Sequence, residues 1–304
     1  MSEFVPTPTA EVCIDSALVA SLLREQHPDL AQLPLGERHE GWDNVTWRLG
    51  GDLAVRLPRR AIASTMVATE LAWLPRIGKD WPFRAPLPVR IGSPNEAYPW
   101  RWSVVPWISG HTAYDEPLSA LGAHDLGLAL AALHQSAPAD APVNPFRSTP
   151  LSQRVDRAKA RLTALASQAA SHPSTGGARL DTDAAESLLR RGARRHAPGL
   201  VCAHLDIHGG NVITDGGRLA GIIDWGDAGA GDAATDLGQA YVLLGPTRWR
   251  TMITAYGRAN RDTISRAKAE AVACAVTLAT ITDGRYAASG WDALVSLGVA
   301  TREA

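Results

Sequence analysis

Two segments in the second half of the chain gather side chains that can do chemistry. The first, AHLDIHGGN (203–211), contains Asp206 and Asn211, and the second, IIDWGD (222–227), contains Asp224. A carboxylate can accept a proton from a hydroxyl group, and amide and carboxylate oxygens are ligands that Mg²⁺ prefers. These residues are therefore candidates for a base and a metal clamp.

The spacing of these residues favours phosphoryl transfer. The first segment has the pattern H-x-D-x-x-x-x-N, and an aspartate follows the next apolar run, as in phosphoryl-transfer enzymes of the protein-kinase kind. This reaction needs a carboxylate that accepts the proton of a positioned hydroxyl, a role that fits Asp206. Asn211 and Asp224 would ligate Mg²⁺ while the phosphates of ATP complete its shell.

Two other motifs in this region fit less well. His204 and His208 have the spacing of a helical zinc site, but no glutamate lies between them and Gly209-Gly210 would break the helix. We expect His204 to be buried by the loop and hydrogen-bonded to backbone instead. The run GAGDAA (229–234) satisfies G-x-G-x-x-A, but it does not directly follow a strand and lacks a downstream acidic residue for a ribose.

The elements before residue 108 are predicted to be mostly strands. The strands are predicted at 45–49, 53–57, 89–92 and 102–105. Gly50-Gly51-Asp52 would join the first two as a hairpin, because glycine supplies the positive φ that such a turn requires. Helices are predicted at 16–25 and 65–74, the second capped by Ser64 and ended by Pro75.

From Leu118 onward, helical periodicity dominates. Helices are predicted at 118–135, at 152–170 and through the tail after residue 247. The run HPSTGG (172–177) predicts a loop, and Asp183 with Glu186 predicts a capping-box start for the next helix. Short apolar runs on either side of the H-x-D motif predict strands, so that the motif lies on a loop after one strand and Asp224 lies at the end of another.

The motifs together resemble the aminoglycoside phosphotransferase family, the small-molecule branch of the protein-kinase-like fold. AHLDIHGGNVI is similar to the family's H-G-D-x-H-x-x-N-x-[LIV] loop, IIDWGDAGAGDAATDLG to its I-D-[WF]-x-x-x-x-x-G-D-x-x-x-D-[LI] segment, and LGLALAALHQ to its L-x-x-L-H helix. The resemblance covers about residues 36–245. Leu205 stands where the family usually has glycine, which predicts a slightly different backbone there and leaves Asp206 and Asn211 in register.

The resemblance implies an α+β, bilobal protein-kinase-like fold. Residues 1–107 would form a small nucleotide-binding lobe, an antiparallel sheet with one helix, preceded by the N-terminal helix. Residues 108–304 would form a larger, mainly helical lobe for catalysis and acceptor binding. The γ-phosphate of ATP or GTP would be transferred, with Mg²⁺ as cofactor, to a hydroxyl group of a small molecule.

The resemblance also implies nucleotide contacts in the first lobe. Arg56 stands where the family carries a lysine or an arginine, and it would pair with the α- and β-phosphates while Glu70 holds it. In the segment between the lobes, Pro106 would accept from the adenine amine and Ile108 would donate to the ring. Asn44, in the segment that replaces a glycine-rich phosphate loop, would contact phosphate.

In the second lobe the resemblance implies supporting roles for two residues beside the base. Asp236 would bind the backbone of the catalytic loop from the following helix and keep Asp206 aimed, and Asp232 would be structural. His204 belongs to the same supporting set.

Composition limits the partners and the location. The 30 basic and 31 acidic side chains leave a net charge of −1, so the chain lacks the positive charge that nucleic acid or an anionic membrane would attract. Three separated cysteines, Cys13, Cys202 and Cys274, and the absence of a long apolar run predict a cytoplasmic protein. We expect a monomer or a homodimer, but the sequence does not decide between them. A near-neutral chain disfavours a polycationic aminoglycoside as acceptor.

Several acceptors and two other classes of function stay open at this stage. The family includes enzymes that act on antibiotics (aminoglycosides, macrolides, cyclic peptides) and on metabolites such as choline, homoserine or sugars. The thin phosphate loop and Arg56 also suit a catalytically inactive nucleotide-binding module, although the intact Asp206, Asn211 and Asp224 argue against it. A metal-dependent phosphoester hydrolase would need a second cluster of ligands, which the sequence lacks.

Overall fold

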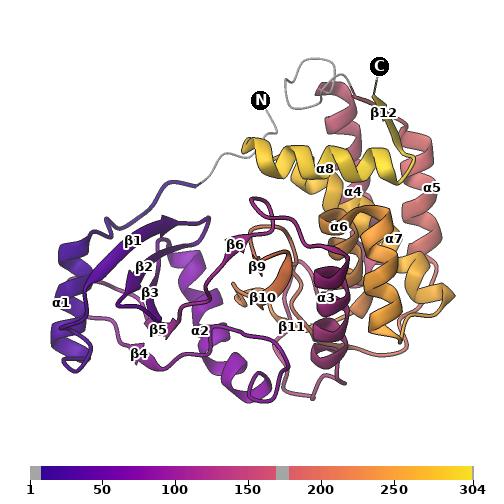
Figure 1. The fold of residues 1–304 in the computed structure, drawn as a ribbon. Helices are drawn as coiled ribbons and strands as arrows, with labels where there is room; N and C mark the ends of the chain where they lie inside the picture. Colours follow the sequence, from indigo (N-terminus) through magenta and orange to yellow (C-terminus); the bar gives the residue numbers. More distant parts are fainter. Residues whose placement is uncertain (1–7, 169–177, 303–304) are drawn as a thin grey trace. The chain divides into compact units, whose positions relative to one another are not determined.

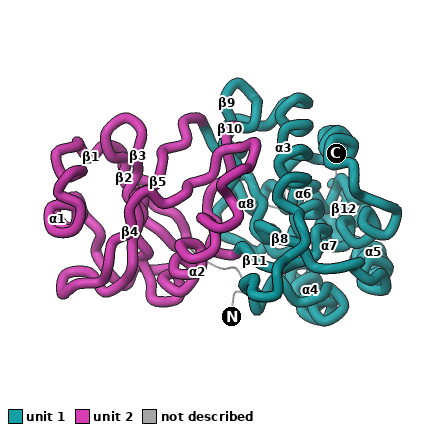
Figure 2. The backbone as a smooth tube through the Cα atoms, turned by 90° about the horizontal axis from the view of Figure 1, so that it is seen from below, with its two compact units in different colours: residues 1–7, 111–219, 228–304 teal, residues 8–110, 220–227 magenta. Residues whose placement is uncertain are grey.

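A computed structural model of the chain describes residues 8–168 and 178–302. Contacts within the chain divide it into two compact units (Figure 2). The smaller unit contains residues 8–110 and 220–227, and the larger unit contains residues 111–219 and 228–302 of the described chain. Residues 220–227, which follow the H-x-D segment, therefore belong to the smaller unit, whereas the sequence analysis placed them in the second lobe.

The smaller unit is built on a five-stranded antiparallel sheet with two helices (Figure 1). The strand order is β1-β2-β3-β5-β4. The strands are β1 (Leu35–Glu40), β2 (Asn44–Leu49), β3 (Leu53–Pro58), β4 (Arg90–Gly92) and β5 (Trp102–Pro106), and the helices are α1 (Ser16–Gln26) and α2 (Ala61–Ile77). Trp102, Tyr98 and Leu49 are fully buried in its apolar core.

The predicted hairpin is confirmed. β2 and β3 pair antiparallel from Leu49 opposite Leu53 outward, and Gly50 in the connecting turn has a φ of +60°. β1 was not predicted, because its residues are largely exposed and show no apolar alternation. An edge strand of this kind is held by backbone pairing to β2, which leaves little trace in its side chains.

Helix α2 differs from the prediction at both ends. It begins earlier, with Arg60 at the N-cap position and no side-chain cap, and the Ser64 hydroxyl instead donates to the Ala61 carbonyl at 2.7 Å. The helix also continues through Pro75 and ends at Gly78. Proline removes one backbone donor and its ring crowds the carbonyl of Leu71, so packing of the buried side chains of α2 must offset that cost.

The larger unit is mainly helical. Its helices are α3 (Ala120–Leu133), α4 (Leu151–Gln168), α5 (Thr182–Ala193), α6 (Ala233–Tyr256), α7 (Arg261–Ala279) and α8 (Gly284–Ser296). α6 packs against α3, α7 and α8, and α7 also packs against α4 and α5 (Figure 1). Within the described residues, no helix has the length and apolar character needed to cross a membrane.

Short strands complete the larger unit. The antiparallel pairs are β6 (His111–Thr112) with β9 (Val212–Asp215), β8 (Val201–Ala203) with β11 (Gly229–Gly231), and β7 (Ala178–Leu180) with β12 (Ala300–Arg302). β10 (Arg218–Ile222) runs from the larger unit into the smaller one. The prediction of an all-helical tail was therefore wrong at its end, where β12 pairs with a strand more than a hundred residues earlier.

The start of α5 also corrects the sequence prediction. Asp181, and not Asp183, is the N-cap residue, and its carboxylate accepts from the Ala184 backbone N–H at 2.9 Å. Both Asp181 and Asp183 can cap a helix, so the point at which the chain leaves β7 decides which of them is the N-cap residue. The loop predicted at 172–177 lies outside the described residues.

Candidate active site

The H-x-D segment lies on the loop between β8 and β9 of the larger unit. β8 is anchored by its pairing with β11, and β9 by its pairing with β6. The loop between them is not exposed like an ordinary surface loop, because His204, Leu205 and Asn211 are buried. A buried loop needs partners for its backbone groups, and side chains supply them here.

Leu205 adopts the backbone conformation that glycine favours. Its φ is +66°, in the left-handed region, although its side chain is fully buried. Gly231 on β11 leaves room for that side chain, since a Cβ at Gly231 would lie 2.6 Å from a Leu205 methyl carbon. The leucine therefore keeps a glycine-like turn, and burial of its side chain offsets the strain of about 1–2 kcal/mol.

Asp236, near the start of α6, holds this turn through the backbone. Its two carboxylate oxygens accept from the N–H groups of His204 at 2.8 Å and Leu205 at 2.7 Å. His134, at the end of α3, approaches the same carboxylate at 3.0 Å. Burial alone would raise the pKa of Asp236, but the hydrogen bonds and the charges of His134 and His204 lower it. Its role in aiming the base stays a prediction.

Gln239 supports the loop beside Asp236 and was not found from the sequence. Its side-chain oxygen accepts from the Ile207 N–H at 2.9 Å, and its amide nitrogen donates to the Leu205 carbonyl at 2.7 Å. It follows Asp236 by one helical turn, so both side chains reach the same loop. The spacing of three residues between Asp236 and Gln239 on one helix was the signal in the sequence that could have identified Gln239.

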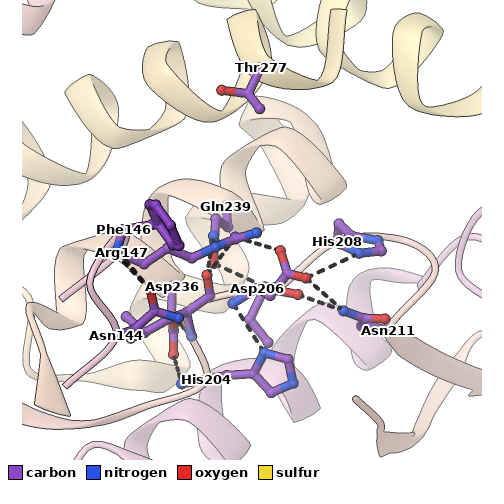
Figure 3. A network of polar contacts seen from close by, with 12 residues as sticks. Asn144, Phe146, Arg147, His204, Asp206, His208, Asn211, Asp236, Gln239 and Thr277 are labelled. Carbon is purple, nitrogen blue, oxygen red and sulfur yellow. Dashed lines mark hydrogen bonds and ion pairs between the residues drawn. The ribbon is translucent and has the colours of Figure 1, made fainter. Parts of the chain in front are cut away.

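Asp206 lies among groups that favour its ionised form (Figure 3). Arg147 donates to its Oδ1 at 2.5 Å, and His208 Nε2 lies 3.6 Å from its Oδ2. Desolvation would raise the pKa of Asp206, but the charges of Arg147, His208 and His204 together hold that pKa below its usual range. The carboxylate is therefore ionised at neutral pH.

Arg147 is the second residue at the site that the sequence did not reveal. It also donates to the Leu205 carbonyl at 2.8 Å, and it lies on a turn in which Asn144 Oδ1 accepts from the N–H groups of Phe146 and Arg147 (Figure 3). This turn lies far from Asp206 along the chain. No local pattern in the sequence links the two.

Asn211 points its amide nitrogen at the base. Nδ2 donates to the Asp206 carbonyl at 3.0 Å and to its Oδ2 at 3.3 Å (Figure 3). This contact orients the asparagine and leaves its amide oxygen for another partner. That oxygen suits a hard cation such as Mg²⁺.

The two histidines of the loop serve its backbone. His204 Nδ1 accepts from the Asp206 N–H at 3.2 Å, and His208 Nδ1 accepts from the Gly210 N–H at 3.0 Å. Across the described parts of the chain, no group of three or more histidine, cysteine, aspartate or glutamate side chains is arranged to hold a metal. The geometry gives no support to the zinc alternative.

A second charged cluster lies in the smaller unit and joins Arg56 of β3, Glu70 of α2 and Asp224. Arg56 pairs with Glu70 through one guanidinium nitrogen and with Asp224 at 3.2 Å through the other. Burial alone would lower the pKa of Arg56, but the two carboxylates raise it. Burial raises the pKa of Glu70 against the opposing charge of Arg56.

Asp224 lies on a strained turn that aromatic packing holds. Its φ is +62°, and the next residue, Trp225, is buried and donates from its indole nitrogen to the Ile222 carbonyl at 2.9 Å. Trp225 stacks on Trp81, with the ring centroids 4.6 Å apart, and Trp81 stacks on Phe83. Within the smaller unit, this stack packs residues 220–227 against the segment that contains Trp81 and Phe83.

The other predicted nucleotide contacts lie in the smaller unit, and their roles stay predictions. Pro106 ends β5 opposite Leu53, and the buried Ile108 follows it beyond the strand. Asn44 begins β2 and is buried, and its Oδ1 has no hydrogen-bond partner in the described structure. A phosphate oxygen would need a donor, so the Asn44 amide nitrogen is the atom suited to that contact.

The segment before β2 is ordered by two arginines that the sequence analysis did not single out. Arg59, which is buried, donates to the Gly41 carbonyl at 2.9 Å and pairs with Glu40 at 2.5 Å. Arg60 pairs with Asp43. These contacts stabilise a loop that contains a single glycine.

Comparison with known proteins identifies the family. The sequence model described as "Phosphotransferase enzyme family" matches residues 35–271. The chain belongs to this family. A search of curated proteins finds no match.

Solved structures similar to this phosphotransferase-family chain share its kinase-like fold at low identity. The GDP complex of wild-type aminoglycoside 2'-phosphotransferase-IIIa is 17% identical, with a TM-score of 0.68 over 94% of this chain and 98% of that one. The apoenzyme of macrolide 2'-phosphotransferase MphH from Brachybacterium faecium is 18% identical, with a TM-score of 0.58 over 95% and 99%. The predicted α+β kinase-like fold is confirmed.

Proposed function

We propose that the protein transfers the γ-phosphate of ATP or GTP to a hydroxyl group of a small molecule, with Asp206 as the base. The observation that carries this proposal is the position of Asp206 on a buried loop fixed by Asp236, with Asn211 against it. Phosphoryl transfer through a loose transition state depends on positioning and charge, so a rigidly held carboxylate is what the reaction needs.

The lowered pKa of Asp206 is compatible with this role. In a loose transition state the acceptor hydroxyl loses its proton late, so a strongly basic group is not required. A carboxylate that stays ionised can orient the hydroxyl and then take its proton. Arg147 and His208 keep it ionised.

The phosphate donor would be bound by residues of the smaller unit. Arg56 is fixed by Glu70, and its planar guanidinium can bind phosphate oxygens through two parallel hydrogen bonds. Asp224 carries a second carboxylate oxygen beyond the one that Arg56 contacts. When bound, Mg²⁺ would offset the negative charge that the phosphates carry. Asn211 and Asp224 each present an oxygen suited to it.

The names of similar structures define the first acceptors to test. Solved structures with this fold include a GDP and kanamycin complex and a streptomycin–ATP complex of aminoglycoside phosphotransferases, as well as macrolide 2'-phosphotransferases. Antibiotics of these types and hydroxyl-bearing metabolites therefore form the acceptor panel. Cytoplasmic location and a monomeric or dimeric state stay predictions.

The test is release of ADP or GDP from Mg-ATP or Mg-GTP across this panel. Wild-type protein should release nucleoside diphosphate in response to one or more acceptors, and Asp206→Asn should lose at least ~10²-fold of that turnover with nucleotide affinity unchanged. Asp215→Asn, an exposed aspartate at the end of β9, is the matched control and should behave as wild type. Equal turnover of Asp206→Asn and wild type would remove Asp206 from the reaction.

A second variant separates this proposal from an inactive nucleotide-binding module. Asp224→Asn should raise the Mg²⁺ concentration needed for half-maximal turnover, because the variant replaces a carboxylate ligand with an amide. An inactive module would bind nucleotide and show no acceptor-stimulated release in any variant. An unchanged Mg²⁺ titration in Asp224→Asn would remove that residue as a ligand.

A further inference from the structure

The face of α4 carries two arginines that the proposed reaction does not use. Arg157 and Arg161 are four residues apart, so they project from the same side of the helix, and both are exposed. Neither has a carboxylate within 4.0 Å in the described structure. Arg154, one turn earlier, differs because it pairs with the buried Glu270.

Contacts place this pair beside the catalytic base. Arg157 lies over the ring of Phe146, 5.9 Å from its centroid, and the next residue, Arg147, is the one that binds Asp206. Phe146 is exposed, so this aromatic surface is also open to a ligand.

Arg161, on the same face of α4, contacts α7. It donates to the Thr277 hydroxyl at 2.8 Å, and Thr277 lies one turn after Cys274 on α7. Burial raises the pKa of Cys274 to about 12, and the charges of Arg147 and Asp206 also act on that thiol.

The charge of this region is positive. Asp206 is already paired with Arg147, and Glu270 with Arg154, so the nearby carboxylates are occupied. Desolvation lowers the pKa of Arg161, and the positive charges of Arg157 and Arg147 lower it further. Arg157 and Arg161 have no carboxylate partner in the described structure, and two like charges in that state favour binding of an anion.

We propose that Arg157 and Arg161 form an anion subsite of the acceptor site, so that the acceptor carries an oxyanion, a carboxylate or phosphate group, in addition to the hydroxyl that is phosphorylated. The inference rests on the proposed function. The guanidinium pair would bind the oxyanion through charge-assisted hydrogen bonds and direct the hydroxyl toward Asp206. A polycationic aminoglycoside would be repelled by the same charges.

The experiment compares binding of matched acceptors that differ only in charge. Isothermal titration with hydroxy acids (4-hydroxybenzoate, homoserine, glycerol 3-phosphate), with the amides of the two carboxylic acids, with glycerol and with kanamycin needs no turnover. At least one acid should bind ~10-fold or more tightly than its neutral partner, the ratio that one hydrogen bond to a charged group provides. Arg157→Gln/Arg161→Gln should remove that preference. Arg191→Gln/Arg194→Gln on and after α5 makes the same change in charge at exposed positions and should retain it.

The outcomes separate the subsite from the phosphotransferase. Equal binding of acids and neutral partners, tighter binding of kanamycin, no binding of any acid at millimolar concentration, or an unchanged preference in Arg157→Gln/Arg161→Gln would each overturn the anion subsite. If the charge preference holds but no acceptor stimulates release of nucleoside diphosphate that depends on Asp206, the subsite stands and the proposed phosphotransferase fails. The thermal midpoint of each variant checks that it is folded.

Discussion

Two carboxylates of this protein are each paired with an arginine beside a left-handed turn, but the two pairs are built in opposite ways. In the larger unit Asp206 is the less exposed partner, with 23% of its side chain accessible, and Arg147 is 35% accessible. In the smaller unit Arg56 is the less exposed partner at 11%, and Asp224 is 40% accessible. Leu205 precedes Asp206 at a φ of +66°, and Asp224 itself has a φ of +62°.

The difference in exposure shows which partner of each ion pair the surrounding structure holds in place. Asp206 is held through its backbone, because Asp236 and Gln239 bind the residues on either side of it. Arg56 is held through its side chain, because the buried Glu70 binds it. The larger unit therefore positions a carboxylate and the smaller unit a guanidinium, which under the proposed function would act on the acceptor hydroxyl and on the phosphates respectively.

The largest effect should come from removing the backbone anchor of the catalytic loop. Asp236→Ala leaves the N–H groups of His204 and Leu205 and the His134 ring without their buried acceptor, so the free energy of unfolding should fall by ~3–5 kcal/mol. Urea unfolding with an unchanged m-value would measure it. Asp262→Ala, at an exposed position on α7, should change stability by less than ~0.5 kcal/mol. A similar loss of unfolding free energy in both variants would show that Asp236 stabilises the fold no more than Asp262 does.

The side-chain anchor of the smaller unit should matter less, because a second carboxylate remains. Glu70→Gln keeps the volume but removes the charge that faces Arg56, while Asp224 still pairs with it. We expect a loss of ~1.5–3 kcal/mol in unfolding free energy, the value of a hydrogen bond to a charged group, and weaker nucleotide binding. Fluorescence titration with a nucleotide analogue measures the second effect. Full nucleotide affinity in Glu70→Gln would mean that Arg56 needs no anchor.

The two regions also differ in how far the sequence predicts them. The loop between β8 and β9 could be predicted because apolar runs flank the H-x-D-x-x-x-x-N motif, and the hairpin around Gly50 because its turn residues and apolar alternation are local. The catalytic role of that loop stays a prediction. Arg147 and the β7–β12 pair could not, since they depend on contacts between distant parts of the chain. The helix boundaries predicted at Ser64 and Pro75 were wrong, because tertiary packing sets where α2 begins and ends.

A smaller effect is expected from Arg147, the half-buried arginine that pairs with Asp206. Arg147→Gln removes a charge that lowers the pKa of Asp206, so that pKa should rise and the acid limb of the kcat/KM profile should move to higher pH. The pH dependence of the free energy of unfolding should shift in the same direction, toward higher pH. The ionised Asp206 stabilises the fold above the usual carboxylate range, and in the variant this contribution should be lost at a higher pH as the solution is acidified. Superimposable pH profiles for Arg147→Gln and wild type would show that the ion pair does not tune the base.

The smallest expected effect is the difference in stability between two substitutions of Leu205, which tests the left-handed turn before Asp206. Leu205→Ala and Leu205→Gly both remove a buried side chain, and each should cost several kcal/mol because Gly231 leaves a cavity around the missing atoms. Alanine is normally the more stabilising of the two. At a φ of +66° the order should reverse, with Leu205→Gly more stable than Leu205→Ala by ~1 kcal/mol, because glycine has no left-handed penalty. Paired unfolding curves measure the difference. An alanine variant more stable than the glycine variant would mean that the loop relaxes to a right-handed turn once the leucine is gone, and that the buried side chain, not the backbone, imposes the conformation before Asp206.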